Sequence, residues 1–201
     1  MKNLPIFLFL CVIIGITSFR CRKESTEKTI DLVIESENSK KEIYYITNDI
    51  EFTYCLLNKD SLPTTSFKEG ENILFHFSIK NNRNENLSLV NNFITNNDFC
   101  KVYSFDGSII GSPFKFLAMD MIGSGANPFP LNAEYQINIP WIDTRENWSS
   151  LHSYFQSTHQ NSLPKGKYYT LFSQRFRFDR TIDQPSLYTD SISFKINFII
   201  N

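Results

Sequence analysis

Three histidines, His76, His152 and His159, are the side chains of this chain most suited to binding a transition metal. His152 and His159 are seven residues apart, and no cysteine or glutamate stands beside them at zinc-ligand spacing. His76 falls on the more polar face of an expected strand. The sequence therefore predicts no metal site, and we expect the histidines in surface or capping roles.

Two cysteines of the expected folded region, Cys55 and Cys100, have two possible states. An even number in an exported chain is consistent with a disulfide, whereas separate buried thiols would behave as small hydrophobic residues. Sequence does not show whether the two Cα atoms approach closely enough for a bond, so both states stay open. No cysteine–histidine pairing is recognisable, and we predict a catalytic nucleophile at neither position.

The acidic segment around Asp179 and the glycine-containing segment Met121–Pro130 do not indicate an active site either. Asp179 and Asp183 could be imagined as the carboxylate pair of a glycosidase, but they lie in a polar segment that ends in proline, where solvated loop charges are expected. The segment Met121–Pro130 contains Gly-Ser-Gly without the surroundings of a nucleophile elbow or a dinucleotide-binding loop. We predict no catalytic residue, no cofactor and no enzymatic activity.

One aromatic cluster, formed by Trp141, Trp148, Tyr154 and Phe155, is a candidate binding surface. Exposed aromatic rings stack on sugars or anchor protein interfaces, and this cluster lies in the longest irregular stretch of the chain. The alternative is structural: Trp148 and Phe155 could fasten a short helix to the rest of the domain.

The N-terminus predicts export. Residues 1–20 contain a lysine, an apolar run from Leu4 to Ile16 and a more polar end, which is the pattern of a secretory signal peptide. The run is shorter than the roughly 20 apolar residues that a membrane-spanning helix needs. Cleavage is therefore expected rather than permanent anchoring by this segment.

A cysteine directly follows the signal. Cys21 and the polar residues after it resemble the lipidation site of Bacteroidota lipoproteins, in which the acylated cysteine becomes the new N-terminus. This resemblance implies an outer-membrane-anchored lipoprotein on the periplasmic or cell-surface face. The alternative is a soluble periplasmic or secreted protein.

Length and composition predict a single folded domain. Residues 21–29 are polar and read as a tether, so residues 30–201 form a single domain large enough for a core. The net charge is −1, from 20 basic and 21 acidic residues, which does not predict nucleic acid as a partner. Phenylalanine occurs 19 times, which favours strands that pack large aromatic side chains.

Two segments alternate apolar and polar residues with the period of a strand. Their apolar members are Ile73, Phe75, Phe77 and Ile79 in the first segment, and Ile192, Phe194, Ile196, Phe198 and Ile200 in the second. Weaker strands are expected over 50–58, 98–106, 134–141 and 167–178. Asp106-Gly107 predicts a hairpin with a tight primed turn, because this pair tolerates a positive φ.

A helix is expected only over 144–156, where apolar residues recur at spacings of three and four. One short helical insertion among about seven to eight strands predicts an all-β fold, an immunoglobulin-like β-sandwich rather than a barrel.

Three phrases carry a resemblance to known families: "FKEGENILFHFSIKNN", "FCKVYSFDGSIIGSPF" and "LPKGKYYTLFSQRF". They resemble short uncharacterised Bacteroidota lipoproteins and, more loosely, the layout of the intracellular proteinase inhibitor (BsuPI-like) domain. The resemblance implies an immunoglobulin-like sandwich and identifies no catalytic residue.

The expected function is that of a non-enzymatic lipoprotein, a binding or structural accessory at the bacterial cell envelope. Its expected partners are the membrane, through the lipid anchor, and an unknown envelope protein or glycan. Two alternatives remain: a protease inhibitor that acts through exposed loops, and a glycan-binding module that uses the aromatic cluster around Trp141.

Overall fold

The computed structural model describes residues 28–32, 41–90, 98–116, 126–142, 155–157, 159, 161–180 and 183–201. These residues form strands and no helix. The strands are β1 (Lys28–Leu32), β2 (Glu42–Thr47), β3 (Ile50–Leu57), β4 (Ser66–Phe67), β5 (Leu74–Asn81), β6 (Leu87–Val90), β7 (Val102–Ser104), β8 (Ile109–Gly111), β9 (Phe114–Phe116), β10 (Ala126–Phe129), β11 (Glu134–Pro140), β12 (Phe155–Ser157), β13 (Gly166–Gln174), β14 (Arg177–Asp179), β15 (Leu187–Tyr188) and β16 (Ile192–Ile200).

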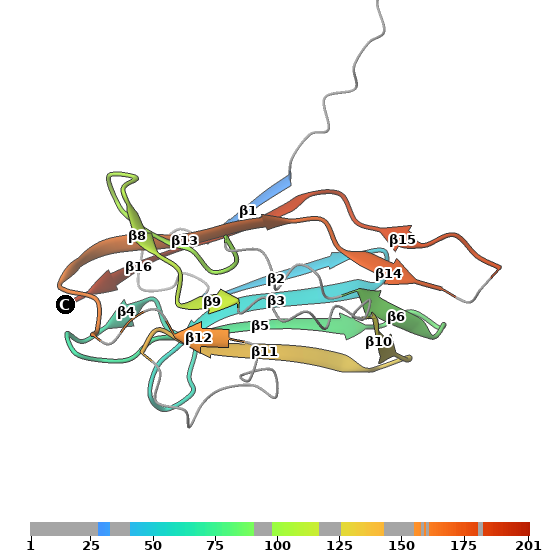
Figure 1. Ribbon diagram of the computed structural model, residues 1–201, viewed down its shortest axis with the longest axis horizontal. Coiled ribbons are helices and arrows are strands. Elements are labelled where there is room, and N and C mark those ends of the chain that lie inside the picture. Colours follow the sequence, from blue (N-terminus) through green and yellow to red (C-terminus); the bar gives the residue numbers. More distant parts are fainter. Residues whose placement is uncertain are drawn as a thin grey trace, which may run out of the picture.

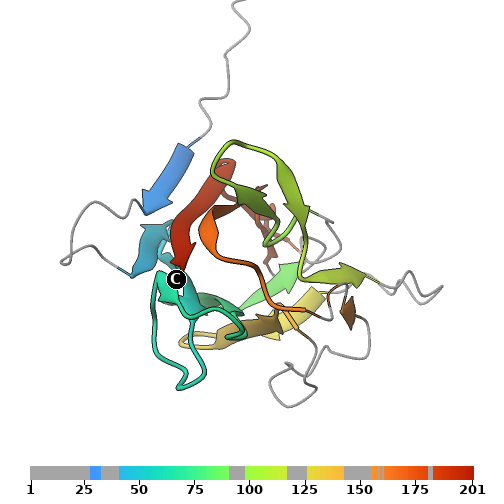
Figure 2. The same cartoon turned by 90° about the vertical axis from the view of Figure 1, so that its left-hand side faces the viewer.

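Two main sheets make the sandwich (Figure 1). The β16 sheet has the order β1-β16-β13-β7-β8, with β4 also paired to β16, and the β5 sheet has the order β11-β5-β3-β2. A smaller end sheet, β10-β6-β14-β15, lies at one end of the sandwich, and β9 pairs with β12. Seen along the sandwich, the strands of the two main sheets surround a common interior (Figure 2).

The strand order is that of an immunoglobulin-like fold. The neighbours β16, β13 and β7 correspond to the G, F and C strands of one immunoglobulin sheet, and β3, β5 and β11 to the A, B and E strands of the other. β1 and β4 both run parallel to the last strand, β16, whereas the other main-sheet pairings are antiparallel. The prediction of an all-β, immunoglobulin-like β-sandwich is confirmed, although the described residues form more and shorter strands than the seven or eight expected.

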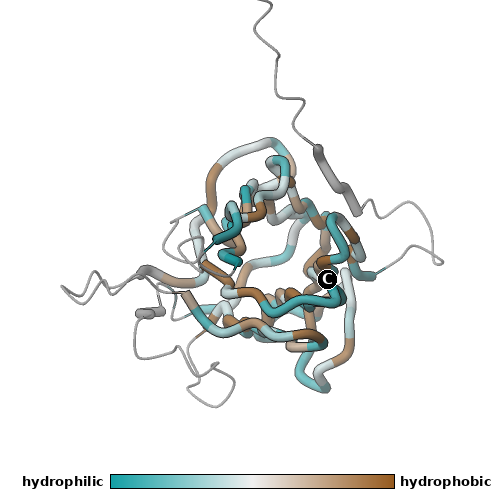
Figure 3. The backbone as a smooth tube through the Cα atoms, turned by 90° about the vertical axis from the view of Figure 1, so that its right-hand side faces the viewer, coloured by the Kyte–Doolittle hydropathy of each residue, from teal (hydrophilic) through white to brown (hydrophobic). Residues whose placement is uncertain are grey.

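Both clear predictions of alternation are confirmed. All nine apolar residues of the two series are buried. Figure 3 shows hydrophobic and hydrophilic stretches interspersed along the chain. The interior is rich in aromatic rings, as the composition predicted. Its central members are Phe52, Tyr54, Phe77, Phe99, Phe172, Phe176 and Phe194, with ring centroids 4.6–6.4 Å apart.

The segment 167–178, expected as one strand, is two. β13 belongs to the β16 sheet and β14 to the end sheet. Between them the Phe176 N–H donates to the Thr189 hydroxyl (3.0 Å), and the Thr189 N–H donates to the Phe176 carbonyl (3.0 Å). Residue 189 thus redirects the chain from one sheet to the other.

The hairpin at Asp106-Gly107 is present between β7 and β8, but its turn is not primed. Only Gly107 has a positive φ (91°), the Gly107 N–H donates to the Ser104 carbonyl, and the Ser104 N–H donates to the Ser108 carbonyl. The two-residue primed turn lies instead at Asn48 and Asp49 (φ 53° and 57°), between β2 and β3.

The helix expected over 144–156 is wrong at its C-terminal end, where Phe155 and Gln156 belong to β12. Pairing with β9 supplies the backbone hydrogen bonds of this segment from a distant part of the chain. Residues 144–154 lie outside the described residues. β1 includes Lys28 and Thr29, the last two residues assigned to the tether.

Candidate functional site

The outer face of the β5 sheet, on the side away from the core, carries three rows of cross-strand neighbours. The rows are Glu42–Cys55–His76–Asn138, Tyr44–Thr53–Ser78–Gln136 and Ile46–Glu51–Lys80–Glu134. These residues alternate along each strand with core residues, so they point the opposite way. The result is a largely polar surface with two exposed apolar side chains at its β2 margin, Tyr44 (56% exposed) and Ile46 (49%).

Tyr44 is held in a defined orientation on this surface. Its hydroxyl donates to Oε2 of Glu51 (3.0 Å), and Nδ2 of Asn82 donates to the same oxygen (3.0 Å). The hydrogen bond to the Glu51 carboxylate is the main cause that raises the pKa of the Tyr44 phenol. A ring that is fixed before binding loses less conformational entropy when a partner covers it.

The first row brings together a cysteine, a histidine and an asparagine that the sequence did not reveal as neighbours. Cys55 stands opposite His76, and Nδ1 of His76 is 2.6 Å from Oδ1 of Asn138. However, Cys55 is only 2% exposed. Burial, with a smaller contribution from the Glu42 carboxylate, raises the pKa of its thiol to about 12. A thiol that stays protonated is a poor nucleophile, so the row does not support cysteine catalysis.

Cys55 and Cys100 are separate buried thiols, and the disulfide alternative is wrong. Tyr54 faces the core and lies against Cys100, whereas its chain neighbour Cys55 faces the other side of the same strand. The two sulfur atoms are thus on opposite faces of the β5 sheet. Cys21, the predicted lipidation site, lies outside the described residues.

Trp141 is not an exposed binding residue. Its side chain is 2% exposed, its ring stacks on His159 with the centroids 3.7 Å apart, and its Nε1 donates to the Asn161 carbonyl (3.2 Å). Burial lowers the pKa of His159, which favours the neutral form of the stacked ring. Trp148 and Tyr154 lie outside the described residues, and Phe155 is the first residue of β12. The structure therefore removes Trp141 from the predicted cluster.

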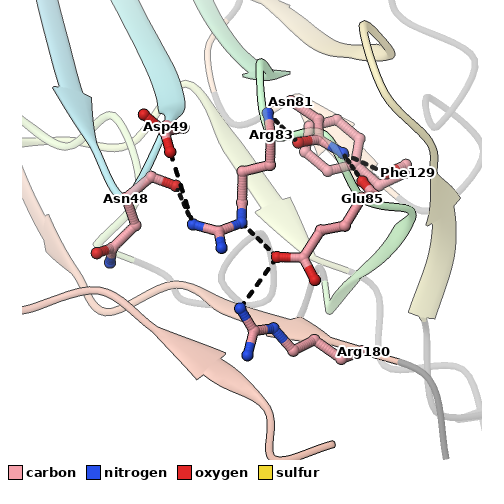
Figure 4. Close-up of polar contacts among 7 residues, drawn as sticks. All are labelled: Asn48, Asp49, Asn81, Arg83, Glu85, Phe129 and Arg180. Carbon is pink, nitrogen blue, oxygen red and sulfur yellow. Dashed lines mark hydrogen bonds and ion pairs between the residues drawn. The ribbon is translucent and has the colours of Figure 1, made fainter.

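An ion-pair cluster lies where the β2–β3 turn, the β5–β6 connection and the end of β14 meet (Figure 4). Oε1 of Glu85 accepts from Nε of Arg83 (2.5 Å) and from a terminal nitrogen of Arg180 (3.0 Å). Arg83 also donates to the Asn48 carbonyl (2.7 Å) and lies 4.0 Å from the Asp49 carboxylate. The hydrogen bond from Arg83 is the main cause that lowers the pKa of Glu85.

Asn81 supports this cluster from inside. Its buried amide donates to the carbonyls of Glu85 (3.0 Å) and Phe129 (2.8 Å), and its side-chain oxygen accepts from the Arg83 N–H (2.9 Å). The buried Asn81 side chain thus links the ion-pair cluster to the core. The cluster itself has a structural role, because it holds together the β2–β3 turn, the β5–β6 connection and the end of β14.

The sequence reasoning did not identify β2 and its exposed residues. The alternation in Glu42–Thr47 is weak because hydrophobic residues stand on both faces of the strand, with Ile43 and Tyr45 inward and Tyr44 and Ile46 outward. The Asn-Asp pair after β2 was the available signal, since such residues adopt the positive φ of a two-residue hairpin.

Comparison with profiles of known protein families, with curated proteins and with solved structures found no match. Within the ranges that the structure describes, no set of three histidine, cysteine or acidic side chains is placed to hold a metal ion. The same residues include no helix long and apolar enough to cross a membrane.

Proposed function

We propose that the chain is an exported, lipid-anchored, non-enzymatic lipoprotein that binds an envelope protein through the outer face of the β5 sheet. The observation that carries the proposal is the exposed pair Tyr44 and Ile46, fixed on a rigid sheet beside rows of polar side chains. Aromatic and apolar anchors surrounded by polar groups are typical of protein interfaces. The high pKa of the Cys55 thiol argues against a cysteine nucleophile on this face.

The lipid anchor is part of this proposal. It rests on the apolar N-terminal run and on Cys21, which follows the end of that run after four residues. In the sandwich, β1 lies at an edge of the β16 sheet, and the outer face of the β5 sheet points away from that sheet (Figure 1). A protein anchored through residues before β1 would leave the β5 face accessible to a partner.

Photo-crosslinking in intact cells tests the proposal. A photoreactive phenylalanine analogue at position 44 or 46 should give a discrete crosslinked species, identified by mass spectrometry. The matched control places the analogue at Leu62, which is similarly exposed (60%) but lies on the β3–β4 connection. An identical pattern of adducts from positions 44, 46 and 62 would contradict a specific binding face.

A glycan is the second candidate partner, because Tyr44 shares a row with Thr53, its direct neighbour on β3, and with the exposed Gln136 amide on β11. Aromatic planes beside such groups suit sugar rings. Glycan-array binding that disappears in Tyr44→Ala and persists in Leu62→Ala would favour it.

A further inference from the structure

The β7–β8 hairpin carries exposed apolar residues on both sides of its polar turn, Asp106-Gly107-Ser108. Phe105 is 68% exposed, Ile109 is 64% exposed, and Ile110 beside it is also exposed. These three residues, here called the hairpin tip, lie within six positions of one another on one short hairpin. Exposed large apolar side chains close together on one hairpin are a candidate contact surface.

Hydrogen bonds hold the turn of the hairpin and the backbone of Phe105. Oδ1 of Asp106 accepts from the Ser104 hydroxyl (2.5 Å) and from the Ser108 N–H (3.0 Å), which closes the turn. The Phe105 N–H donates to the Lys167 carbonyl (3.0 Å), and the Lys167 ammonium lies 6.0 Å from the centre of the Phe105 ring. Because these contacts exist in the uncovered state, the apolar residues are presented at little entropic cost.

The hairpin tip and the point where the tether enters the fold lie on the same side of the molecule. In both Figure 1 and Figure 2 the start of β1 and the β7–β8 loop are at the top, on the β16-sheet side. Cys21 is seven residues before Lys28, the first residue of β1. A chain of that length spans at most about 25 Å, so a lipid on Cys21 would hold this side close to the bilayer.

We propose that the hairpin tip docks into the lipid surface to which the chain is anchored, an inference that rests on the lipid anchor of the proposed function. Phe105 and Ile109 enter the headgroup–acyl boundary, while the ionised Asp106 and the long Lys167 side chain stay at headgroup level. Insertion is therefore shallow. The tether supplies a high local concentration, so that even a weak apolar contact keeps the tip docked. The domain is thereby held in one orientation, with the β5 face directed away from the membrane.

Quenching by brominated lipids tests this docking on the full-length lipidated chain. The variants are Phe105→Trp and, as a matched control, Leu62→Trp, which is similarly exposed on the β3–β4 connection at the bottom of Figures 1 and 2. Each is reconstituted in phosphatidylethanolamine–phosphatidylglycerol vesicles with brominated acyl chains, and the emission of the unsubstituted chain is subtracted. We expect the added emission of Phe105→Trp to fall by about half, and that of Leu62→Trp to be unchanged.

Sedimentation of the chain with the vesicles distinguishes a failure of the docking from a failure of the lipid anchor. If the lipidated chain sediments but Phe105→Trp is quenched no more than Leu62→Trp, the docking is overturned and the anchor stands. If the chain sediments no better than Cys21→Ser, the anchor fails and the docking fails with it. A blue shift of the Phe105→Trp emission without bromine quenching would assign the hairpin tip to a protein contact, such as a second copy, and would also overturn lipid docking.

Discussion

The two cysteines of the sandwich have thiols of low acidity. Burial raises the pKa of Cys55 to about 12, and raises that of Cys100 further above its ordinary value of 9.0. A thiolate is the reactive form in alkylation and disulfide exchange. Low acidity and burial together should protect both side chains in the folded protein.

We therefore expect both thiols to resist alkylation in the native state and to react fully once the chain is unfolded in urea. The measurement is intact mass after timed treatment with iodoacetamide, with and without denaturant. A mass increase on reduction alone, before any alkylation, would reveal a disulfide and contradict the arrangement on opposite faces of β3.

Tyr54 joins the two main sheets by a buried hydrogen bond. Its hydroxyl lies 2.9 Å from Oγ1 of Thr170 on β13, and both side chains are buried. Tyr54→Phe should lower the free energy of unfolding by about 1 kcal/mol, because it leaves the Thr170 hydroxyl without this partner. Urea unfolding measures the change. Tyr44→Phe, on the exposed face, is the control, and an equal loss there would show that burial is not the cause.

At the residue scale the sequence predicted burial well where alternation was regular, as at Phe75 and Phe77, because one face of a strand must enter the core. The sequence did not predict that the Trp141 side chain is buried. Beside an irregular segment the sequence has no repeating pattern that would indicate which side chains are buried. The ring of Trp141 is covered by His159, which stands 18 residues later in the chain.

At the scale of elements, the break between β13 and β14 depends on one hydroxyl. Thr189 is buried, and its Oγ1 accepts the Phe176 N–H that would otherwise continue the ladder of β13. The aromatic content of 167–178 predicts strand throughout, and it gives no sign of this break. The deciding acceptor stands 13 residues further along the chain.

Thr189→Val, which removes the hydroxyl at nearly constant volume, should lower the free energy of unfolding by about 2 kcal/mol. Thr189→Ser retains the oxygen and should cost about 1 kcal/mol or less, from the lost methyl group alone. Thermal or urea unfolding followed by circular dichroism compares the two variants. If they are equally stable, the hydroxyl does not hold the junction.

At the scale of the whole molecule, the immunoglobulin-like order could be predicted because alternation, turn residues and aromatic content all favoured a sandwich. The surfaces could not be predicted in the same way. Tyr44, Glu51 and Asn82 meet only through the register of β2 with β3 and the course of the chain after β5. Such register is a property of the assembled sheet rather than of any one segment.

Glu85 is the point where the ion-pair cluster ties separate parts of the molecule together, and its charge should make stability depend on pH. Hydrogen bonds from Arg83 and Arg180 lower the pKa of Glu85 below its ordinary value of 4.5. A carboxylate with a lowered pKa stabilises the fold fully above its unfolded-state pKa, and this contribution is lost as the pH falls through the folded-state value. Glu85→Gln should therefore cost about 1 kcal/mol at neutral pH, and the difference from the unsubstituted chain should be smaller at an acid pH below 4.5. Urea unfolding at the two pH values measures it, with Asp60→Asn on an exposed loop as the control. If Glu85→Gln lowers the free energy of unfolding equally at both pH values, the shape of the side chain, and not its charge, holds the three connections together.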